Sequence, residues 1–223
     1  MPQYAETLEA KDQALLYNTI SIDGEPEIFR MSTDRFGRQN TNMIENGDMV
    51  VVSSGTWTCG RCFSAEMMYY VDTQYGFIRC ESDNLSCIQD AEDKRGVMAV
   101  YHCVKPLIIR GLVFYRGRSI YGGGLYSNGG SLTLEICSFK ECKATGAAGG
   151  GGLYANRGNV DLYAVSFANN AASNGKRADL ATNSGTVIIH SNCPLDLRGS
   201  ATSELDLEIH IESRLGVISG PSQ

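Results

Sequence analysis

The chain is poor in proline, has no concentrated positive charge and contains no long apolar run. Its 223 residues include 5 prolines, and its formal net charge is −6 with a sequence pI near 5.1. The longest basic clusters are the pairs Lys94-Arg95 and Lys176-Arg177. Electrostatic binding of nucleic acid needs a basic face, so we expect no nucleic-acid partner. No apolar run approaches the ~20 residues that span a bilayer, so we expect no transmembrane segment.

A secretory leader is also missing from the first ten residues. The sequence MPQYAETLEA lacks the basic and apolar parts of such a signal. We therefore expect either an intracellular chain or a mature form whose leader has been removed. The eight cysteines favour the second alternative, because disulfides persist in oxidising compartments. We expect a secreted, cell-surface or other extracytoplasmic protein.

What the chain does contain is an internal repeat. GGGLYSNGGSLTLEICSFKEC begins at Gly122, and GGGLYANRGNVDLYAVSFANN begins at Gly150, an offset of 28 residues. Apolar and polar residues alternate within each copy, which puts one set of side chains on an inner face of a strand and the other toward solvent. Self-similarity at this period is typical of a solenoid, whose equivalent strands stack about 4.8 Å apart.

The repeat extends in both directions along the chain. Leu107 and Ile109 align with Leu132 and Leu134 at an offset of 25 residues, which indicates a shorter corner. We predict an all-β fold, a right-handed parallel β-helix of about five to six coils. Its parts are an N-terminal cap at residues 1–48, whose segment 4–18 favours a short helix, coils at 49–211 with loop-rich early coils at 59–96, and a C-terminal tail at 212–223.

Two resemblances support this fold. Gly-Gly-x-Leu-Tyr followed by Phe-x-x-Asn resembles the repeats of bacterial polymorphic outer-membrane proteins and, more broadly, pectin-lyase-like right-handed parallel β-helices. Phe167 to Asn170 matches Phe-x-x-Asn in full, whereas Phe139 to Cys142 has Cys in place of Asn. A group of predicted β-helix proteins from marine algae is similar in the runs IRCESDNLSCIQDAEDKRGVMAVY and LIIRGLVFYRG. These resemblances cover roughly residues 50 to 200 and imply a fold, and the algal group implies no function.

The cysteines divide into candidate disulfides and a buried thiol. Cys80 and Cys87 bracket the polar loop ESDNLS, and Cys59 and Cys62 form a CxxC, so we expect disulfides among these four. A zinc site built from the same four thiolates is the alternative, although the second pair is spaced too widely for a common zinc ribbon. Cys137 aligns with Val165, which predicts a buried, unreactive thiol.

The same polar loop contains a second candidate modification site. Asn84-Leu85-Ser86 is a glycosylation sequon, and it agrees with passage through a secretory route.

The charged residues predict neither a catalytic site nor a metal site. Polysaccharide lyases of the resembling fold use an Arg or Lys base and Ca²⁺ bound by carboxylates, which implies an acidic cluster. The outward charged residues of the two copies form no such cluster at the repeat offset; they are Glu135, Lys140, Glu141, Arg157 and Asp161. Glu135 aligns with Tyr163, so the repeat does not place the second carboxylate of a glycosidase.

Calcium is a second metal alternative, beside zinc. Asp90, Glu92 and Asp93 supply carboxylates for Ca²⁺ but lack the spacing of a known calcium loop. We therefore expect no catalytic residue, no metal and no cofactor.

Four residues are candidates for binding. Tyr126 and Tyr154 align at the repeat offset, and either an aromatic ladder for sugar rings or packing at the corner beneath a loop explains that alignment. Arg157 and Asp161 are the outward charged residues of the second copy. His102, His190 and His210 have no Ser, Cys or paired carboxylate at a recognisable spacing and are expected on the surface or in loops.

These observations favour a non-catalytic module that presents a lateral face to a protein or glycan partner. One alternative is a polysaccharide lyase or glycoside hydrolase that works in a groove beside the early-coil loops. A second is a scaffold subunit of a larger complex, which would leave one coil face unusually apolar.

Overall fold

The computed structural model describes part of the chain: residues 19–22, 49–52, 54–58, 66–72, 76–147, 149–173, 178–190, 192–193 and 209–212. Every regular element in these ranges is a β-strand. No helix long and apolar enough to cross a membrane occurs among them. The predicted helix at 4–18, the cysteines Cys59 and Cys62 and most of the predicted tail lie outside the described residues.

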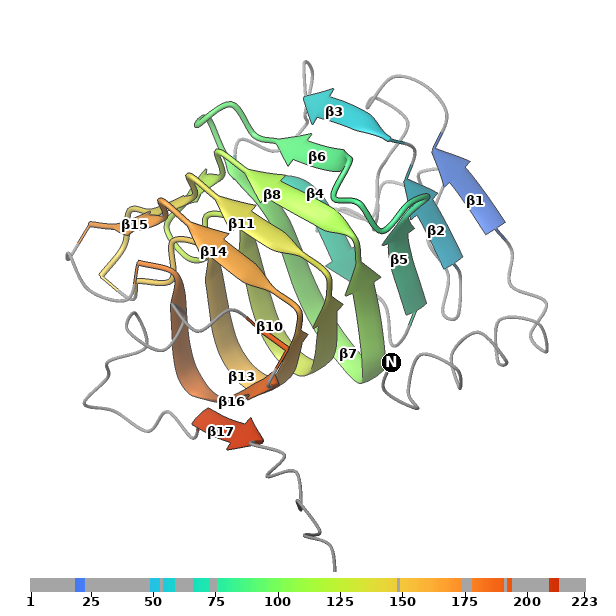
Figure 1. Ribbon diagram of the computed structural model, residues 1–223. Helices are drawn as coiled ribbons and strands as arrows, with labels where there is room; N and C mark the ends of the chain where they lie inside the picture. Colours follow the sequence, from blue (N-terminus) through green and yellow to red (C-terminus); the bar gives the residue numbers. More distant parts are fainter. Residues whose placement is uncertain are drawn as a thin grey trace, which may run out of the picture.

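The strands form three parallel sheets that run side by side along the molecule (Figure 1). Sheet A contains β1 (Thr19–Ile22), β2 (Met49–Val52), β4 (Met67–Asp72), β5 (Gly76–Cys80), β7 (Gly96–Arg110), β10 (Leu125–Glu135), β13 (Leu153–Tyr163), β16 (Leu180–His190) and β17 (Ile209–Glu212). Sheet B contains β3 (Gly55–Thr58), β6 (Cys87–Asp90), β8 (Leu112–Tyr115), β11 (Ser138–Lys140) and β14 (Ser166–Ala168). Sheet C contains β9 (Arg118–Ser119), β12 (Lys143–Ala144) and β15 (Ala171–Ala172).

The register places equivalent residues of successive repeats directly against each other. Leu132 pairs with Val160, and Phe139 pairs with Phe167. Each of the three central turns adds one strand to each sheet: β7, β8 and β9, then β10, β11 and β12, then β13, β14 and β15. The predicted parallel β-solenoid is therefore confirmed. The best-described region forms about four turns, so the count of five to six coils and the right-handed sense stay predictions.

The repeat length changes at one corner and at an irregularity within sheet A, where the register between β7 and β10 shifts from Cys103 opposite Gly130 to Leu107 opposite Leu132. Leu107 pairs with Leu132, so the offset of 25 residues predicted for this coil is correct. The segment from β9 to β10 spans residues 120–124, whereas the segment from β12 to β13 spans residues 145–152. We call this connection between sheets C and A the C–A corner. It absorbs insertions because it lies outside the sheet ladders.

Strands also occur where a cap and loops were expected. β1 lies within residues 1–48 and pairs in parallel with β2, so sheet A begins inside that segment. β4 and β5 lie within residues 59–96 and pair with the two halves of β7. The early region therefore contributes strands to the coil as well as loops, and the proposed domain boundaries stay predictions.

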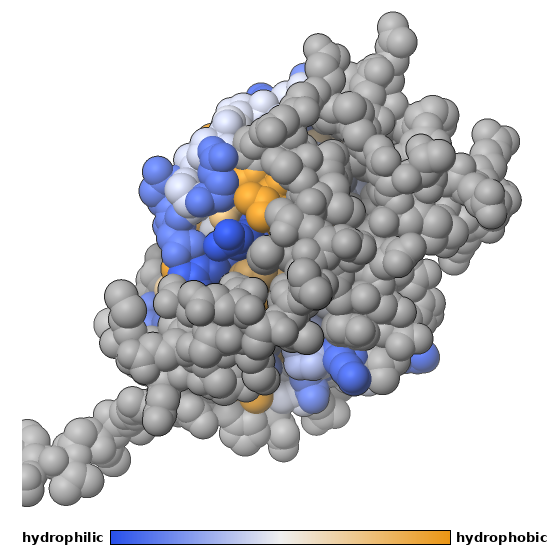
Figure 2. Space-filling model, turned by 90° about the vertical axis from the view of Figure 1, so that its right-hand side faces the viewer, coloured by the Kyte–Doolittle hydropathy of each residue, from blue (hydrophilic) through white to orange (hydrophobic). Residues whose placement is uncertain are grey.

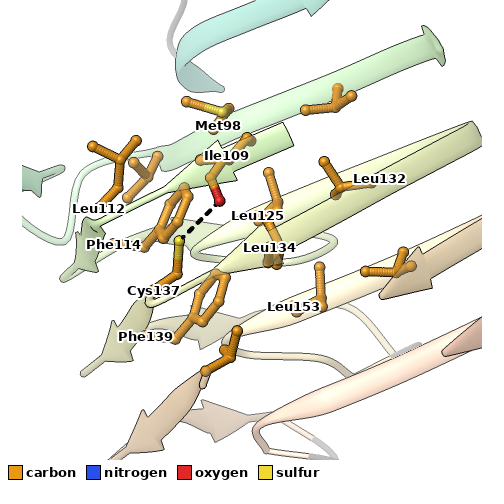
Figure 3. Packing of buried hydrophobic residues seen from close by; sticks show 14 of the residues in the cluster. Met98, Ile109, Leu112, Phe114, Leu125, Leu132, Leu134, Cys137, Phe139 and Leu153 are labelled. Carbon is orange, nitrogen blue, oxygen red and sulfur yellow. Dashed lines mark hydrogen bonds between the residues drawn. The ribbon is translucent and has the colours of Figure 1, made fainter. Parts of the chain in front are cut away.

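The interior of the coil is apolar and ordered in rows (Figure 3). Leu132 and Leu134 of sheet A are buried together with aromatic side chains of sheet B. The rings of Phe114, Phe139 and Phe167 stack with successive centroid distances of 4.5 and 4.9 Å. Stacked aromatic pairs contribute roughly 0.5–1.5 kcal/mol beyond their area burial. This row therefore stabilises the register as well as the core.

A buried cysteine continues the apolar interior. Cys137 is fully buried, and its thiol donates to the carbonyl oxygen of Ile109 at 3.4 Å (Figure 3). Desolvation raises the pKa of this thiol to about 12, so the side chain stays protonated at neutral pH and the nucleophilic thiolate does not form. The expected burial of this thiol is confirmed.

Asn170 explains the Phe-x-x-Asn pattern of the second copy. Its side-chain oxygen accepts a hydrogen bond from the backbone N–H of Cys142 at 2.9 Å, and its amide donates to the carbonyl oxygen of Phe139 at 3.1 Å. One coil earlier, the Cys142 thiol donates to the carbonyl oxygen of Phe114 at 3.4 Å. Cysteine thus keeps the donor role of the missing asparagine, with a weaker donor.

The corners between sheets A and B use a recurring left-handed backbone. Gly111, Ile136 and Ala164 occupy equivalent positions with φ of 76°, 50° and 51°. Only glycine adopts this conformation without steric cost. Hydrogen bonds between neighbouring coils hold the strained residues, since the N–H of Ile136 donates to the carbonyl oxygen of Tyr163 at 2.9 Å.

Replacing the central ring of the phenylalanine row tests whether the row determines stability. Phe139 is fully buried between two stacked rings, so Phe139→Ala leaves a cavity and is expected to lower the free energy of unfolding by about 3–5 kcal/mol. Urea unfolding followed by circular dichroism measures the loss. Lys140→Ala, at the exposed neighbouring position, is the control and should change it by under about 0.5 kcal/mol. Equal effects of the two variants would contradict the role of the row.

Candidate functional site

The outer face of sheet A carries the side chains that alternate with the buried ones along each strand. In β10, Leu132 and Leu134 are buried, and Thr133 between them is partly exposed. Stacking of the coils arranges these outward residues in columns. We define three: the tyrosine column is Tyr126 and Tyr154; the asparagine column is Asn128, Asn156 and Asn183; the charged column is Arg79, Arg110, Glu135, Tyr163 and His190.

The asparagine column is a continuous amide ladder. The amide of Asn156 donates to the side-chain oxygen of Asn128 at 3.0 Å, and Asn183 donates in the same way to Asn156 at 3.0 Å. Each amide thereby forms a side-chain hydrogen bond with the equivalent amide of the adjacent coil. Asn156 also donates to the hydroxyl oxygen of Tyr126 at 3.3 Å, which ties this ladder to the tyrosine column.

The tyrosine column lies beneath a residue of the C–A corner. The ring of Tyr121 stacks on Tyr126 and on Tyr154 with centroid distances of 5.7 and 5.5 Å, and the two rings of the column lie 5.9 Å apart. Tyr154 is only 6% exposed, whereas Tyr121 is 45% exposed. Packing at the corner beneath a loop therefore describes how Tyr126 and Tyr154 lie, and Tyr121 presents the exposed ring.

Comparison of the two repeats could not identify Tyr121 as a candidate binding residue. It precedes the three glycines of the first copy and aligns with Gly149 in the second, so it does not recur. Its side-chain type and its place beside a glycine-rich corner were the only available signals. The structure adds the contact, because the corner folds back over sheet A.

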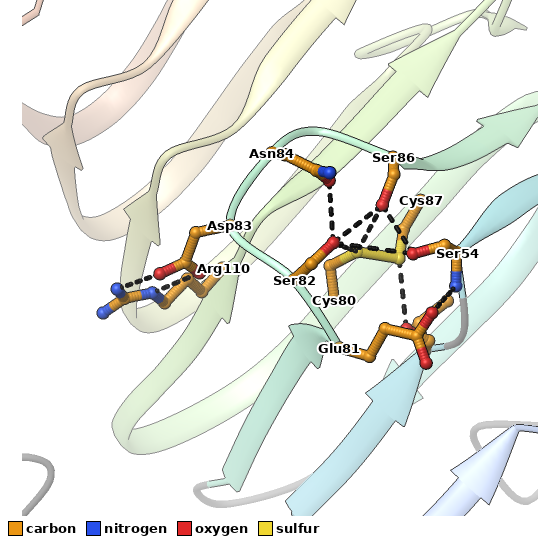
Figure 4. The surroundings of a disulfide bond; sticks show 10 residues. Ser54, Cys80, Glu81, Ser82, Asp83, Asn84, Ser86, Cys87 and Arg110 are labelled. Carbon is orange, nitrogen blue, oxygen red and sulfur yellow. Dashed lines mark hydrogen bonds and ion pairs between the residues drawn. A yellow bond between two sulfur atoms is a disulfide. The ribbon is translucent and has the colours of Figure 1, made fainter.

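The charged column is centred on Arg110, whose contact with Asp83 is drawn in Figure 4. Its guanidinium donates to both carboxylate oxygens of Asp83 at 2.9 and 2.5 Å, and it lies 3.3 Å from a carboxylate oxygen of Glu135. The hydrogen bonds from Arg110 lower the pKa of Asp83. Burial raises the pKa of Glu135 although Arg110 opposes the shift. Arg79 lies beside Arg110 on the adjacent strand, and within the described structure its buried Nε has no hydrogen-bond partner.

Asp161 also faces outward and contacts the next coil. Its carboxylate lies 3.1 Å from Nε2 of His190, and the His190 ring stacks on Tyr163 with a centroid distance of 3.7 Å. Arg157 is exposed at the bend of β13, where its φ is 67°. Three of the four predicted binding residues, Tyr126, Tyr154 and Asp161, thus share the outer face of sheet A. Arg157 lies at the bend within it, and ligand binding by these residues stays a prediction.

A disulfide closes the loop beside the charged column (Figure 4). Cys80 and Cys87 are bonded to each other, as predicted. This bond is incompatible with the alternative in which both cysteines bind zinc as thiolates together with Cys59 and Cys62. Because Asp83 lies within the closed loop, the disulfide limits how far its carboxylate can move from Arg110.

Hydroxyl groups line the same loop. The hydroxyl of Ser86 lies 2.6 Å from that of Ser54 and 2.8 Å from that of Ser82, and Ser82 donates to the side-chain oxygen of Asn84 at 2.7 Å. Asn84 is exposed. The sequon is therefore presented on the surface of a covalently closed loop.

The three carboxylates considered for Ca²⁺ each pair with a different cation. Arg116 donates from Nε to Asp90 at 3.0 Å, Lys94 lies 3.1 Å from Glu92, and Lys143 lies 3.0 Å from Asp93. Within the described ranges, no group of three or more His, Cys, Asp or Glu residues is arranged to hold a metal ion. The ion pairs of Asp90 and Asp93 join different coils, and that of Glu92 lies within one turn.

Comparisons with protein-family models, with curated proteins and with solved structures found no match to this chain. A coil of this kind supports many unrelated activities. The side chains on the outer face of sheet A and on the disulfide loop are therefore the features that bear on function.

Replacing Asp83 tests the electrostatic link between the loop and sheet A. The pKa of Asp83 is lowered in the fold, so its ionised form stabilises the native state above the unfolded-state pKa of about 3.9, and this contribution is lost as pH falls through the folded-state pKa. The side chain is 51% exposed, so screening limits the contribution to under about 1 kcal/mol.

We expect Asp83→Asn to unfold at a lower temperature than the wild type at about pH 7, and we expect this difference to be smaller at about pH 2. Differential scanning calorimetry at the two pH values measures both differences. A deficit of the same size at both would mean that the substitution perturbs the loop conformation and not the charge pair.

Proposed function

We propose that this chain is a non-catalytic β-helix module that presents the outer face of sheet A to a protein or glycan partner. The observation that carries the proposal is the order of this face, on which aromatic, amide and charged side chains form columns over successive coils. Stacked repeats create extended surfaces that suit elongated partners. A repetitive partner such as a glycan chain meets similar groups at regular intervals along such a surface.

The pairing of charges on this face supports binding over catalysis. Arg110 is held by Asp83 and Glu135, and Asp161 is held by His190. Side chains that are paired with one another stabilise the coil. The aromatic and amide side chains beside them are suited to contact a neutral, hydroxyl-rich partner.

The described surface also favours a binding module over a scaffold subunit. Among the described residues, the exposed large hydrophobic side chains are Ile120 and Tyr121. Figure 2 shows one side of the molecule, on which the described surface is mainly hydrophilic with a small hydrophobic area. A scaffold face would be a broad apolar patch of several hundred Å².

The proposal includes the type of coil. We take it to be a right-handed helix of the pectin-lyase-like kind with repeats similar to those of polymorphic outer-membrane proteins. The contacts of Asn170 with Phe139 and Cys142 in the preceding coil support this assignment, because they give Phe-x-x-Asn a structural role.

One observation favours an alternative, a glycoside hydrolase. Glu135 and Asp161 both face outward on adjacent strands and are offset by two residues, which places them about 8 Å apart at ordinary strand spacings. Inverting hydrolases separate their carboxyl groups by about 6.5–9.5 Å. The raised pKa of Glu135 suits a general acid.

A panel of neutral and acidic polysaccharides, with and without Ca²⁺, separates the two functions. We expect the chain to be retarded in affinity electrophoresis by at least one polysaccharide and to release no reducing or unsaturated sugar from any. Sugar release that Glu135→Gln abolishes, with Glu141→Gln as the exposed control, would establish the hydrolase instead.

We also propose an extracytoplasmic location. The disulfide between Cys80 and Cys87 and the exposed sequon at Asn84 support it, because oxidised cysteines and N-glycans are both acquired along a secretory route.

Expression through a eukaryotic secretory pathway tests this location. We expect the wild-type chain to carry one N-glycan, seen as a mass decrease on treatment with peptide N-glycosidase, and Asn84→Gln to show no decrease. Asn159→Gln, at an exposed asparagine outside any sequon, should behave as the wild type. An unglycosylated wild-type chain would count against the secretory route.

A further inference from the structure

We infer that Tyr121, supported by Tyr126 and Tyr154, is a binding platform for a pyranose ring of a neutral glycan. This inference rests on the proposed binding function and names the ligand class and the contacting residue. Its starting point is the exposure of Tyr121 at 45% beside Ile120 at 59%, the two exposed large hydrophobic side chains of the described residues.

The ring of Tyr121 is held in place before any ligand arrives. It stacks on two other tyrosines, at 5.5 and 5.7 Å with interplanar angles of 25° and 26°. Tyr101 supports the group from the side, with its ring edge-on to Tyr126 at 5.9 Å. A pre-positioned aromatic ring loses little conformational entropy on binding, which favours affinity from a small contact.

The backbone of the C–A corner is fixed as well. The carbonyl oxygen of Ile120 accepts a hydrogen bond from the N–H of Gly146 at 3.1 Å. Thr145 donates from both its N–H and its hydroxyl to the carbonyl oxygen of Ser119, at 2.8 and 3.1 Å. The exposed pair at residues 120–121 therefore sits on a corner anchored to the next coil, and its apolar groups are held toward solvent.

The side chains around Tyr121 are suited to both the apolar and the polar groups of a sugar ring. A pyranose has an apolar C–H face, which suits an aromatic ring, and a rim of hydroxyls, which suits groups that both donate and accept. Beside the tyrosines, Asn156 and the hydroxyl of Tyr126 form such a rim, and the amide ladder continues it to Asn128 and Asn183. Neither column contains a charged side chain, which favours a neutral sugar.

A protein partner fits this feature less well. A stable protein interface buries about 800 Å² on each partner around a central cluster of anchors. The exposed apolar surface here comes from two adjacent side chains, an area suited to one or two sugar rings.

The test uses the full chain and isothermal titration calorimetry with the neutral hexasaccharides of cellulose, laminarin, mannan and xylan. Hexagalacturonate is included as an acidic probe because Arg157 is exposed at the bend of β13. The variants are Tyr121→Ala and Tyr121→Phe. Tyr115→Ala, at a partly exposed tyrosine of sheet B, is the matched control.

We expect at least one neutral hexasaccharide to bind, Tyr121→Ala to weaken it roughly tenfold to a hundredfold, and Tyr121→Phe and Tyr115→Ala to keep it within about threefold. Should Tyr121→Ala fold poorly, tyrosine ring resonances of the ¹³C-labelled wild type give a second measurement. The hexasaccharide should shift the Tyr121 signal most.

Three results would overturn the inference in distinguishable ways. Unchanged affinity in Tyr121→Ala would remove the platform and leave the binding module standing. Binding of hexagalacturonate alone would remove the neutral class. Failure of every hexasaccharide to bind would remove both the platform and the glycan part of the proposed function.

Discussion

Stacking of like on like is the constraint on which this structure depends. In a parallel solenoid each residue meets its equivalent in the coil above and in the coil below, so every position must tolerate contact with its own kind. Phenylalanine does so by ring stacking, as in Phe114, Phe139 and Phe167. Asparagine does so by donating and accepting along the ladder of Asn128 and Asn156.

The carboxylates of the outer face avoid contact with their own kind, although Arg79 does lie opposite Arg110 in sheet A. Like charges directly opposite each other destabilise a sheet. Glu135 accordingly lies between Arg110 and Tyr163, and Asp161 pairs with Thr133 on one side. Repetition therefore spreads carboxylates apart along the coil. Stacking of equivalent residues therefore disfavours a cluster of carboxylates for catalysis or metal binding. It favours rows of aromatic or amide side chains, which can repeat from coil to coil.

The exceptions to repetition that add new groups to sheet A are found at the connections. The C–A corner changes length from coil to coil because it lies outside the ladders, and it brings Tyr121 over two tyrosines of sheet A. The loop closed by Cys80 and Cys87 brings Asp83 to Arg110. Groups that occur once are added to a repeating surface in this way, and specificity on a solenoid arises where a connection folds back onto a face.

The sequence by itself determined the repeat, the alternation of buried and outward residues and hence the parallel stacking of coils. A period of 28 residues leaves few other ways to bury Leu132 and Phe139. It also indicated the Cys80–Cys87 bond, because a loop that short keeps its ends together. Only the tertiary structure decided that Tyr121 covers the tyrosine column, that β1 continues sheet A and that Asp83 pairs with Arg110. Those contacts join residues with no periodic relation, and their positions follow from how each connection folds in space.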